Sequence, residues 1–415
     1  MKVAVIGGGI IGLCSAYYLK KAGHDVLVFD QSSLEDGCSF GNAGMVVPSH
    51  IIPLAAPGMI AKGIRWMFNS KSPFYVRPRL NLDLLRWGLD FYRHANSDHV
   101  ARSVPALKEL SLFSKACYQQ FAREALFDFA YHERGLLMLY QTEAAAHEEG
   151  ETAALANRYG VKAEVLSASE VQALEPVVRV NARGGVFYPG DAHLTPQLLT
   201  RGLIEYLRHE GVQILPSVAV TDFVIQHRHV RSLRTPQGDH AVDSVVLAAG
   251  SWSGELARQL HLRLPMQAGK GYSFTLPEVK KNVRIPSILL EARVAVTPMG
   301  SSLRFGGTME ITGLNHAIQL NRVRGIVEAI PRYYPEMQVS MPKTEEIWHG
   351  LRPCSPDGLP YIGRLTSLPN VIVATGHAMM GLSLAPGTGK LVTELMNEEQ
   401  PTVSLAEFAP ERFVG

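Results

Sequence analysis

A glycine-rich turn near the amino terminus constrains the fold more than any other feature of the chain. Residues 2–6 (KVAVI) form a short apolar run typical of a central parallel strand, and the letters GGGIIG follow directly. In such a turn Gly7 permits the sharp reversal, Gly9 lets the backbone approach a pyrophosphate, and Gly12 allows a helix to pack closely on the strand. The helix predicted to open at Ile10 would face the phosphates with free N–H groups. The order of these elements predicts a dinucleotide-binding α/β unit.

An acidic residue follows the second predicted strand, at the position where a dinucleotide-binding unit uses an acid to hold the ribose. Residues 25–29 are predicted to form a second strand, followed by Asp30 and Gln31. Asp30 lies 18 residues beyond Gly12, close to the roughly 20 residues expected of an acid that holds ribose hydroxyls. An ordinary βαβ turn that binds nothing is the alternative, and the placement of the acid favours a nucleotide site. Asp30, Gln31 and Ile10 are therefore candidate cofactor-binding residues together with the three glycines.

Length and composition narrow the function further. A chain of 415 residues predicts two domains rather than one core. Forty Lys and Arg against 38 Asp and Glu give a charge too balanced to indicate a nucleic-acid partner. Four cysteines without C-x-x-C spacing argue for a reducing compartment and against a disulfide framework or a zinc site, and we predict no metal. The chain starts directly in a strand and has no long apolar run, so we expect neither a signal peptide nor a spanning helix, and a cytoplasmic location.

Two glycine-rich loops lie at opposite ends of the chain. Residues 39–45 (SFGNAGM) are small and polar, and such a loop lets backbone approach a flat ligand. Residues 376–383 (GHAMMGLS) lie between a predicted strand and the closing helix. Met379, Met380 and Leu382 would more often be core residues than a cofactor wall, but the bracketing glycines favour the cofactor. Two such loops meeting over one ring system suit a buried FAD better than an exchanging NAD.

The middle of the chain alternates between helical and strand patterns. The spacing of apolar residues predicts helices and strands: helices over 59–67, 82–94, 104–124, 143–159, 195–209 and 323–334, and strands over 135–140, 185–188, 212–215, 220–234, 240–245 and 244–253. Several short runs within 264–310 favour an antiparallel sheet. We therefore expect a discontinuous FAD-binding domain formed by residues 1–50, 195–265 and 350–415. A substrate-binding domain would comprise residues 51–194 and 266–349.

One part of this second domain has two interpretations. Between residues 59 and 94, apolar and basic side chains are interleaved: Trp66, Met67, Phe68, Leu84, Leu85, Trp87 and Leu89 with Lys62, Arg65, Arg77, Arg79 and Arg86. The simpler interpretation is a helical part of the substrate domain. The alternative is an amphipathic patch that lies on a membrane surface, peripheral to the inner face of the cell membrane.

These motifs together resemble a known family. Residues 3–12, 39–57, 247–252, 350–363 and 376–388 are similar to the D-amino-acid oxidase superfamily, and within it to the bacterial FAD-dependent D-amino-acid dehydrogenases. Glycine oxidases and sarcosine oxidases resemble the chain more distantly. The resemblance implies a Rossmann-like FAD-binding domain of the glutathione-reductase type with an interleaved antiparallel-sheet substrate domain, that is, an α/β plus α+β architecture.

The resemblance also implies individual roles. Gly7, Gly9, Gly12 and Asp30 match the ADP site, and Val218 matches a backbone contact to adenine. The remaining cofactor positions border the pyrophosphate or the flavin ring: Asn42, Ala43, Gly44, Met45, Gly250, Trp252, Gly376, His377, Gly381, Leu382 and Ser383. In sarcosine oxidases a cysteine near the position of Cys354 carries the flavin covalently. Here we expect a buried, inert thiol and non-covalent FAD.

Arg352 matches the arginine that binds the substrate carboxylate in this family. A planar guanidinium offers two parallel, charge-assisted hydrogen bonds to a carboxylate, and Gly350, Pro353 and Pro356 around it favour a fixed position over a surface arginine. Tyr272 and His50 are candidates for lining the substrate site, although a structural role is equally compatible with the sequence.

The implied activity is oxidative deamination of a D-amino acid. The Cα hydrogen would leave as hydride to flavin N5, and the imino acid would hydrolyse to a 2-oxo acid and ammonia, with electrons passing to a quinone or another acceptor. Three alternatives stay open: a D-proline or 4-hydroxy-D-proline dehydrogenase, a glycine- or sarcosine-type oxidase using oxygen, and a flavoprotein subunit active only in a complex. A nicotinamide dehydrogenase fits the two glycine-rich loops least well.

Overall fold

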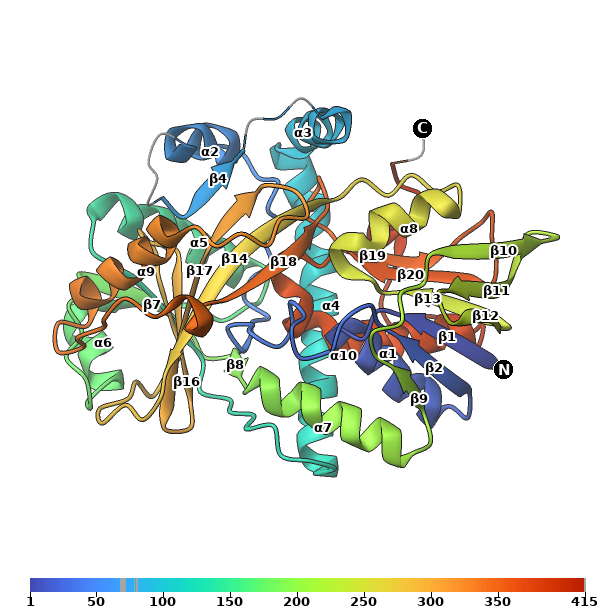
Figure 1. Ribbon diagram of the computed structural model, residues 1–415. Helices are drawn as coiled ribbons and strands as arrows, with labels where there is room; N and C mark the ends of the chain where they lie inside the picture. The colour runs from blue at the N-terminus through green and yellow to red at the C-terminus, as the bar shows by residue number, and fades with distance from the viewer. Residues whose placement is uncertain (68–71, 78, 80, 414–415) are drawn as a thin grey trace.

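The computed structural model describes residues 1–67, 72–77, 79 and 81–413, which form two sheets side by side (Figure 1). The first sheet has six strands in the order β19 (Tyr361–Arg364), β20 (Val371–Thr375), β13 (Ser244–Leu247), β1 (Lys2–Ile6), β2 (Asp25–Phe29) and β9 (Gln213–Leu215). All neighbouring strands are parallel except β19 and β20. This is the Rossmann-like sheet that the amino-terminal motif predicts, and its central strands are buried on both faces.

The two faces of this sheet have different covers. Val3 and Val5 of β1 pack with the helices α1 (Ile10–Lys21), α7 (Pro196–His209) and α10 (Gly381–Met396). Ala4 and Ile6 point to the opposite face, as the alternation of a strand requires, and pack with a three-stranded meander. The meander consists of β10 (Asp222–Gln226), β11 (His229–Thr235) and β12 (Gly238–Ala241), with α8 (Ser253–Gln259) beside it. The result is a three-layer unit in which the sheet lies between helices and the meander.

The second sheet is larger and mostly antiparallel. Its main path runs β18 (Trp348–Cys354), β14 (Gln267–Leu276), β17 (Ser302–Ile311), β16 (Val294–Met299), β15 (Ser287–Leu289), β5 (Leu136–Tyr140), β7 (Gly184–Tyr188) and β6 (Glu164–Ser167), and β4 (Phe74–Val76) pairs with β17. Two pairings are parallel, β5 with β15 and β4 with β17. One face packs on α9 (Leu320–Tyr333), through residues such as Ile326 and Ile330.

The other helices surround or connect the two sheets. They are α2 (Met59–Met67), α3 (Leu82–His94), α4 (Ser97–Glu124), α5 (Glu143–Arg158) and α6 (Ala168–Leu174). The long helix α4 runs between the two halves, whereas α2 and α3 lie together along one edge (Figure 1). Tyr118 of α4 donates to the carbonyl oxygen of Leu382 at 2.6 Å, which fixes α4 against α10. A two-stranded ladder of β3 (Met45–Val46) and β8 (Ala192–His193) joins the end of the loop over 39–45 to the chain that follows β7.

Several elements differ in detail from the expectations. The segment 220–234 is two strands rather than one, because the chain reverses at His227 and Arg228, which both adopt positive φ. The helix expected over 104–124 already begins at Ser97, where the side chain of Asn96 caps it by accepting from the His99 N–H. Residues 376–383 are not entirely a loop, since α10 starts at Gly381. The sequence reading also missed α6 and α8.

The division into two domains remains a proposal, with one boundary moved. A boundary at residue 350 falls inside β18, which pairs with β14 from Trp348 to Cys354. We therefore place the end of the substrate domain after Cys354. Of the interleaved apolar and basic residues, Phe68 lies outside the described residues, as do the side chains of Lys62, Arg65, Trp66 and Met67. No helix in the part of the chain that the structure describes is long and apolar enough to cross a membrane.

Candidate active site

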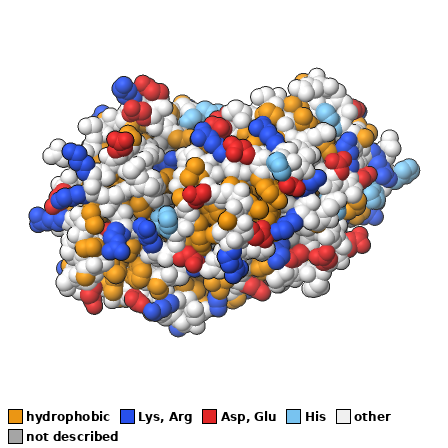
Figure 2. Space-filling view, turned by 90° about the horizontal axis from the view of Figure 1, so that it is seen from below, with side chains coloured by type: hydrophobic (Ala, Val, Ile, Leu, Met, Phe, Trp, Pro, Cys, Tyr) orange, Lys and Arg blue, Asp and Glu red, His pale blue; other side chains and the backbone are white. Residues whose placement is uncertain are grey.

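A cavity of about 720 Å³ lies between the two sheets. On the side of the six-stranded sheet its wall is formed by residues at the carboxyl ends of β1, β2 and β13 and by the loops that follow them. On the other side the wall includes residues of β14, β17 and β18, and the end of β18 lies beside His377. In the face shown in Figure 2, hydrophobic side chains gather near the middle and charged side chains of both signs surround them. Ligands of open α/β sheets bind at this carboxyl edge.

The glycine turn has the geometry that its sequence predicts. Gly7 has φ +107°, a conformation that favours glycine, and its N–H donates to the carbonyl oxygen of Phe29 at 2.7 Å. A Cβ on Gly12 would overlap the carbonyl oxygen of Gly7, so only glycine lets α1 pack this close. Gly7, Gly9 and Ile10 line the cavity, whereas Gly12 lies behind them and does not. Their role in binding FAD stays a prediction.

Asp30 joins the glycine turn to the chain after β2. Its Oδ2 accepts from the N–H of Gly8 at 2.6 Å, and its Oδ1 accepts from the N–H and hydroxyl of Ser32 at 2.8 and 2.7 Å. The backbone oxygen of Asp30 accepts from the N–H of Val218 at 2.8 Å. Asp30, Gln31 and Val218 all line the cavity. The predicted ribose ligand thus also holds this end of the cavity together.

The loop over 39–45 is anchored from both sheets. Ser39 Oγ accepts from the N–H of Ile10 at 2.9 Å, which caps the start of α1 from outside the helix. The carbonyl oxygen of Gly41 accepts from Ser273, and that of Asn42 accepts from the buried guanidinium of Arg304 at 2.9 Å. Burial lowers the pKa of Arg304 to about 10. These contacts fix a loop that the sequence alone describes only as small and polar.

Of the four residues predicted in this loop, three line the cavity and one does not. Asn42, Ala43 and Met45 line the cavity, whereas Gly44 does not. Gly44 has φ +78°, and its N–H donates to the side chain of Asn42 at 2.9 Å, closing the turn. Its part in the site is therefore to shape the loop rather than to form its surface.

The carboxyl-terminal loop faces the same cavity. His377, Gly381 and Leu382 line it, whereas Gly376 and Ser383 do not. His377 Nε2 lies 3.0 Å from the hydroxyl of Thr388, and burial lowers the pKa of this histidine to about 3, so the ring is neutral at physiological pH. Ser383 accepts from the N–H of Val47 at 2.9 Å and thereby joins the two ends of the chain. Gly250 and Trp252, after β13, also line the cavity.

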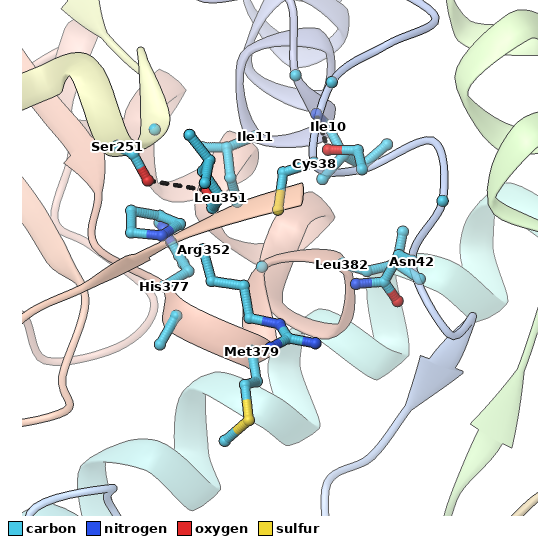
Figure 3. A pocket seen from close by; sticks show the side chains of 18 of the residues that line it. Ile10, Ile11, Cys38, Asn42, Ser251, Leu351, Arg352, His377, Met379 and Leu382 are labelled. Atoms are coloured by element: carbon cyan, nitrogen blue, oxygen red, sulfur yellow. Dashed lines mark hydrogen bonds between the residues drawn. The ribbon is translucent and has the colours of Figure 1, made fainter. Parts of the chain in front are cut away.

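Arg352 projects from β18 into the cavity, on the side where Met379 and Asn42 lie (Figure 3). Its Nη1 donates to the carbonyl oxygen of Thr308 at 2.6 Å. No Asp or Glu among the described residues pairs with it, and burial lowers the pKa of its guanidinium. A Cβ on Gly271 would overlap the guanidinium, so a larger residue at that position would displace the Arg352 side chain. An unpaired cation in a cavity wall is suited to hold an anionic group of a ligand.

Tyr272 and His50, the two further candidates, also line the cavity. The hydroxyl of Tyr272 accepts from the N–H of Gln319 at 3.1 Å, and burial raises its pKa, so it remains protonated. Burial, together with the nearby Arg293, lowers the pKa of His50 to about 4, which keeps the ring neutral. The structure brings both side chains to the site without assigning either a chemical role.

The sequence reading missed several lining residues. Cys38, Thr308, Met309, His316 and Trp348 face the cavity. Trp348 and Thr308 reach the cavity because β14 pairs with both β18 and β17. No short sequence motif predicts this pairing. Cys38 lies between Asp30 and the predicted loop and could have been included from its position. Cys354, in contrast, is fully buried outside the lining, and burial raises its pKa to about 12, as expected for an inert thiol.

The lining fits a large ligand that combines phosphates with a flat polar ring. Five buried polar atoms in it have no partner among the described residues: His50 Nδ1, Thr200 Oγ1, Thr308 Oγ1, Trp348 Nε1 and His377 Nδ1. Buried polar groups are rarely left unpaired, so these atoms indicate an occupant that hydrogen-bonds to them. The volume lies within the usual range of about 300–1,000 Å³ for cofactor sites. The described residues contain no group of three or more His, Cys, Asp or Glu placed to hold a metal ion.

Comparisons with known proteins agree with this geometry. The family model described as FAD dependent oxidoreductase (DAO) matches residues 2–395. A D-amino acid dehydrogenase of Granulibacter bethesdensis is 31% identical over 100% of both chains, and one of Bradyrhizobium diazoefficiens is 31% identical over 100% of this chain and 99% of the other. Among solved structures, glycine oxidase from Geobacillus kaustophilus has a TM-score of 0.79 at 22% identity, covering 100% of this chain and 99% of that one.

A second solved structure supports the same fold. L-proline dehydrogenase from P. horikoshii has a TM-score of 0.77 at 18% identity, and the match covers 100% of this chain and 97% of the other. At such identities these structures support the fold only. The family model, in contrast, spans nearly the whole chain. The chain therefore belongs to the DAO family of FAD-dependent oxidoreductases.

Proposed function

We propose that this oxidoreductase deaminates a D-amino acid. The observation that carries the proposal is Arg352, an unpaired guanidinium in the wall of a cavity whose other end is formed by the glycine turn. A zwitterionic amino acid needs a cation for its carboxylate, and Arg352 offers one. The curated relatives named D-amino acid dehydrogenase, matched over their full length, support the choice of the D-series.

The residues of the chain hold and orient the substrate. The fork of Arg352 would bind the carboxylate, with the Thr308 carbonyl fixing the guanidinium from behind. His50 and His377 are neutral and therefore do not repel the amine. FAD, held by the glycine turn and the two glycine-rich loops, would supply the two-electron acceptor for oxidation of the substrate at Cα. Solvent takes the amine proton and hydrolyses the imino acid, so no side-chain base is required in this scheme.

Quinone is the proposed electron acceptor, with peripheral contact at the cytoplasmic face of the membrane as the place of transfer. A soluble electron-transfer partner is the alternative acceptor under the same proposal. If oxygen accepts the electrons, the enzyme is an oxidase. Reduction of a quinone analogue or of a dye, measured against release of peroxide, separates dehydrogenase from oxidase.

The decisive experiment is anaerobic bleaching of the flavin by amino acids. The purified protein is mixed with a panel of D-amino acids, their L-enantiomers, glycine, sarcosine, D-proline and 4-hydroxy-D-proline. Bleaching by several primary D-amino acids, with their L-forms inactive, supports the proposal. Bleaching only by the cyclic substrates or only by glycine and sarcosine would replace it with the corresponding narrower activity. A colourless chain that does not take up FAD contradicts it altogether.

A further inference from the structure

The pairing of β14 with β17 is interrupted by a bulge in the cavity wall. The register shifts between Lys270 and Tyr272, so that Gly271 alone lies opposite two residues of β17, Thr308 and Met309. Both residues of the bulge line the cavity. Bulges of this kind re-aim a side chain and are frequent next to active sites, because the extra residue leaves the regular alternation of the strand. The side chain of Thr308 is thus placed by the bulge and not by the alternation of β17.

The backbone of Thr308 is strained. Its φ is +66°, in the left-handed region that a β-branched residue rarely adopts. Two contacts hold the chain in this conformation: the N–H of Met309 donates to the carbonyl oxygen of Pro73 at 2.7 Å, and the carbonyl oxygen of Thr308 accepts from Arg352 Nη1 at 2.6 Å. Strained residues that the surrounding structure holds in place occur preferentially at ligand sites. The conformation therefore indicates a function for Thr308 at the cavity.

The hydroxyl of Thr308 is buried without a partner in the described part of the chain. The residue is 8% exposed, it lines the cavity, and no described residue makes a hydrogen bond to its Oγ1. Leaving a buried hydroxyl unpaired is unfavourable. Because the carbonyl oxygen of the same residue accepts from Arg352, the hydroxyl lies within the span of one residue from the guanidinium. Thr308 thus takes up one N–H of the guanidinium and presents an O–H beside it.

This pair of donors adjoins the loop over 39–45. A Cβ built on Gly306, two residues before Thr308, would lie 3.8 Å from the Cβ of Ala43 in that loop, and Ala43 lines the cavity. The acids among the described lining residues both follow β2: Asp30 and Asp36. No acid of the described lining therefore comes from the strands that carry Arg352 and Thr308. Their donors are left for an anionic group of the ligand.

We propose that the Thr308 hydroxyl is a second donor to the substrate carboxylate, beside the guanidinium of Arg352. A carboxylate has lone pairs for more hydrogen bonds than one guanidinium fork supplies, and a hydroxyl that donates to a charged oxygen forms a short, strong bond. The amino group of the substrate is a worse match, because an ammonium there would adjoin the like charge of the guanidinium. The inference rests on the proposed function only for the identity of the ligand as an amino acid, since the two donors would hold any small carboxylate.

Removal of the hydroxyl from the full FAD-loaded protein tests the proposal. Thr308→Val keeps the branched shape and removes the O–H. Its KM for the best D-amino acid of the panel should rise about tenfold or more, as expected for a lost hydrogen bond to a charged group. Its kcat should change less than about threefold, because the carboxylate is bound equally in the ground state and in the transition state. Thr308→Ser, which keeps the hydroxyl, should retain most of the affinity.

Binding of propanoate separates carboxylate recognition from turnover. Propanoate carries the carboxylate of an amino acid without the amine, and its dissociation constant follows from the change in the flavin spectrum during a titration. Thr308→Val should raise this constant by about the same factor as KM.

The matched control is Thr297→Val on β16. Thr297 is also fully buried, its hydroxyl also has no partner among the described residues, and it lies outside the cavity lining. This control should leave both KM and the propanoate dissociation constant unaltered.

A further variant uses the backbone strain. Thr308→Gly removes the hydroxyl and also relieves the left-handed conformation, which glycine adopts freely. Its melting temperature should equal or exceed that of wild type, while propanoate should bind about tenfold or more weakly. A residue with a structural role alone would show the opposite result, a loss of stability with propanoate binding retained.

Three results overturn the proposal. They are a Thr308→Val protein that binds propanoate as tightly as wild type, a fall in kcat with an unaltered propanoate constant, which would assign the hydroxyl to the amine, and equal losses in Thr308→Val and Thr297→Val. Failure of the proposed function gives a different result. Bleaching by D-amino acids with propanoate binding insensitive to Thr308 removes only this inference, whereas propanoate binding that depends on Thr308, without bleaching by any D-amino acid, removes only the substrate assignment.

Discussion

The two ends of the cavity are constructed in different ways. The nucleotide end consists mainly of backbone and small residues from short segments after β1, β2 and β13. The substrate end consists of side chains such as Arg352, Thr308 and Trp348, which strand pairing brings together from β17 and β18. We therefore expect backbone groups to bind the cofactor at the nucleotide end and individual side chains to select the substrate at the other end. Changes at the two ends should separate flavin binding from substrate binding.

The largest expected effect is at the substrate end. Arg352→Ala would leave a bound carboxylate unpaired at a cost of about 3–5 kcal/mol, equal to about two to four decades in kcat/KM. Flavin content should not change, because Arg352 makes no contact with the glycine turn. Steady-state kinetics and the flavin spectrum check both halves of this expectation. Arg352→Lys keeps the charge but not the planar guanidinium, so its kcat/KM should lie between those of wild type and the alanine variant. A loss of kcat/KM below tenfold for the alanine variant would contradict the assignment of Arg352.

The next largest effect is at the nucleotide end. Gly12→Ala places a Cβ against the carbonyl oxygen of Gly7, and because backbone cannot easily move we expect a loss of about 1–3 kcal/mol in the free energy of unfolding, with weaker flavin retention. Chemical denaturation and flavin release measure the two quantities. Gly150→Ala on α5, where no atom lies within 4 Å of the new Cβ, is the matched control and should be neutral or slightly stabilising. Equal behaviour of the two variants would contradict close packing at Gly12.

Asp30→Ala should weaken flavin binding by about tenfold, because hydrogen bonds to a charged group contribute about 1.5 kcal/mol or more. The substrate KM of the fully loaded enzyme should not change, since the side chain of Asp30 contacts Gly8 and Ser32, whereas that of Arg352 contacts Thr308. A titration of the apoprotein with FAD gives the affinity. An unaltered dissociation constant would remove Asp30 from the cofactor site, and an altered KM would show that the two ends are coupled.

Two buried carboxyl groups make stability depend on pH. Burial raises the pKa of two carboxyl groups, Asp191 and Glu149, to about 7 each. Asp191 accepts a hydrogen bond from Ser49, which precedes His50, and Glu149 accepts one from Tyr188. A carboxyl whose folded pKa exceeds its unfolded pKa binds protons more tightly when folded, so stability falls as pH rises from about 4 to 7. Asp191→Asn and Glu149→Gln should flatten this fall. The measurement is the melting temperature of each variant across that pH range. If neither variant changes the dependence of melting temperature on pH, the assignment is wrong.

The contrast between the two ends of the cavity also explains which residues the sequence could predict. The glycine turn, Asp30 and the Rossmann-like sheet follow from short contiguous motifs in which backbone conformation is set locally. Arg352 came from the family resemblance, because nothing near it in sequence indicates a cavity. Thr308 and Trp348 could not be foreseen, since only the register of β14 with β17 and β18 brings them together. The apolar residues of 82–94 follow an amphipathic pattern, but periodicity alone could not show that Trp87 is buried whereas Leu85 and Leu89 are exposed.

The strand order of the six-stranded sheet has a consequence for biosynthesis. β1 is completed at residue 6, yet its neighbour β13 ends at residue 247, and β20 on the far side of β13 ends at residue 375. At ribosomal rates of about 5–20 residues per second, the apolar first strand waits roughly 20–75 s before the sheet around it can be assembled. The cavity, whose walls include residues from both ends of the chain, can therefore be completed only after nearly all of the polypeptide has left the ribosome.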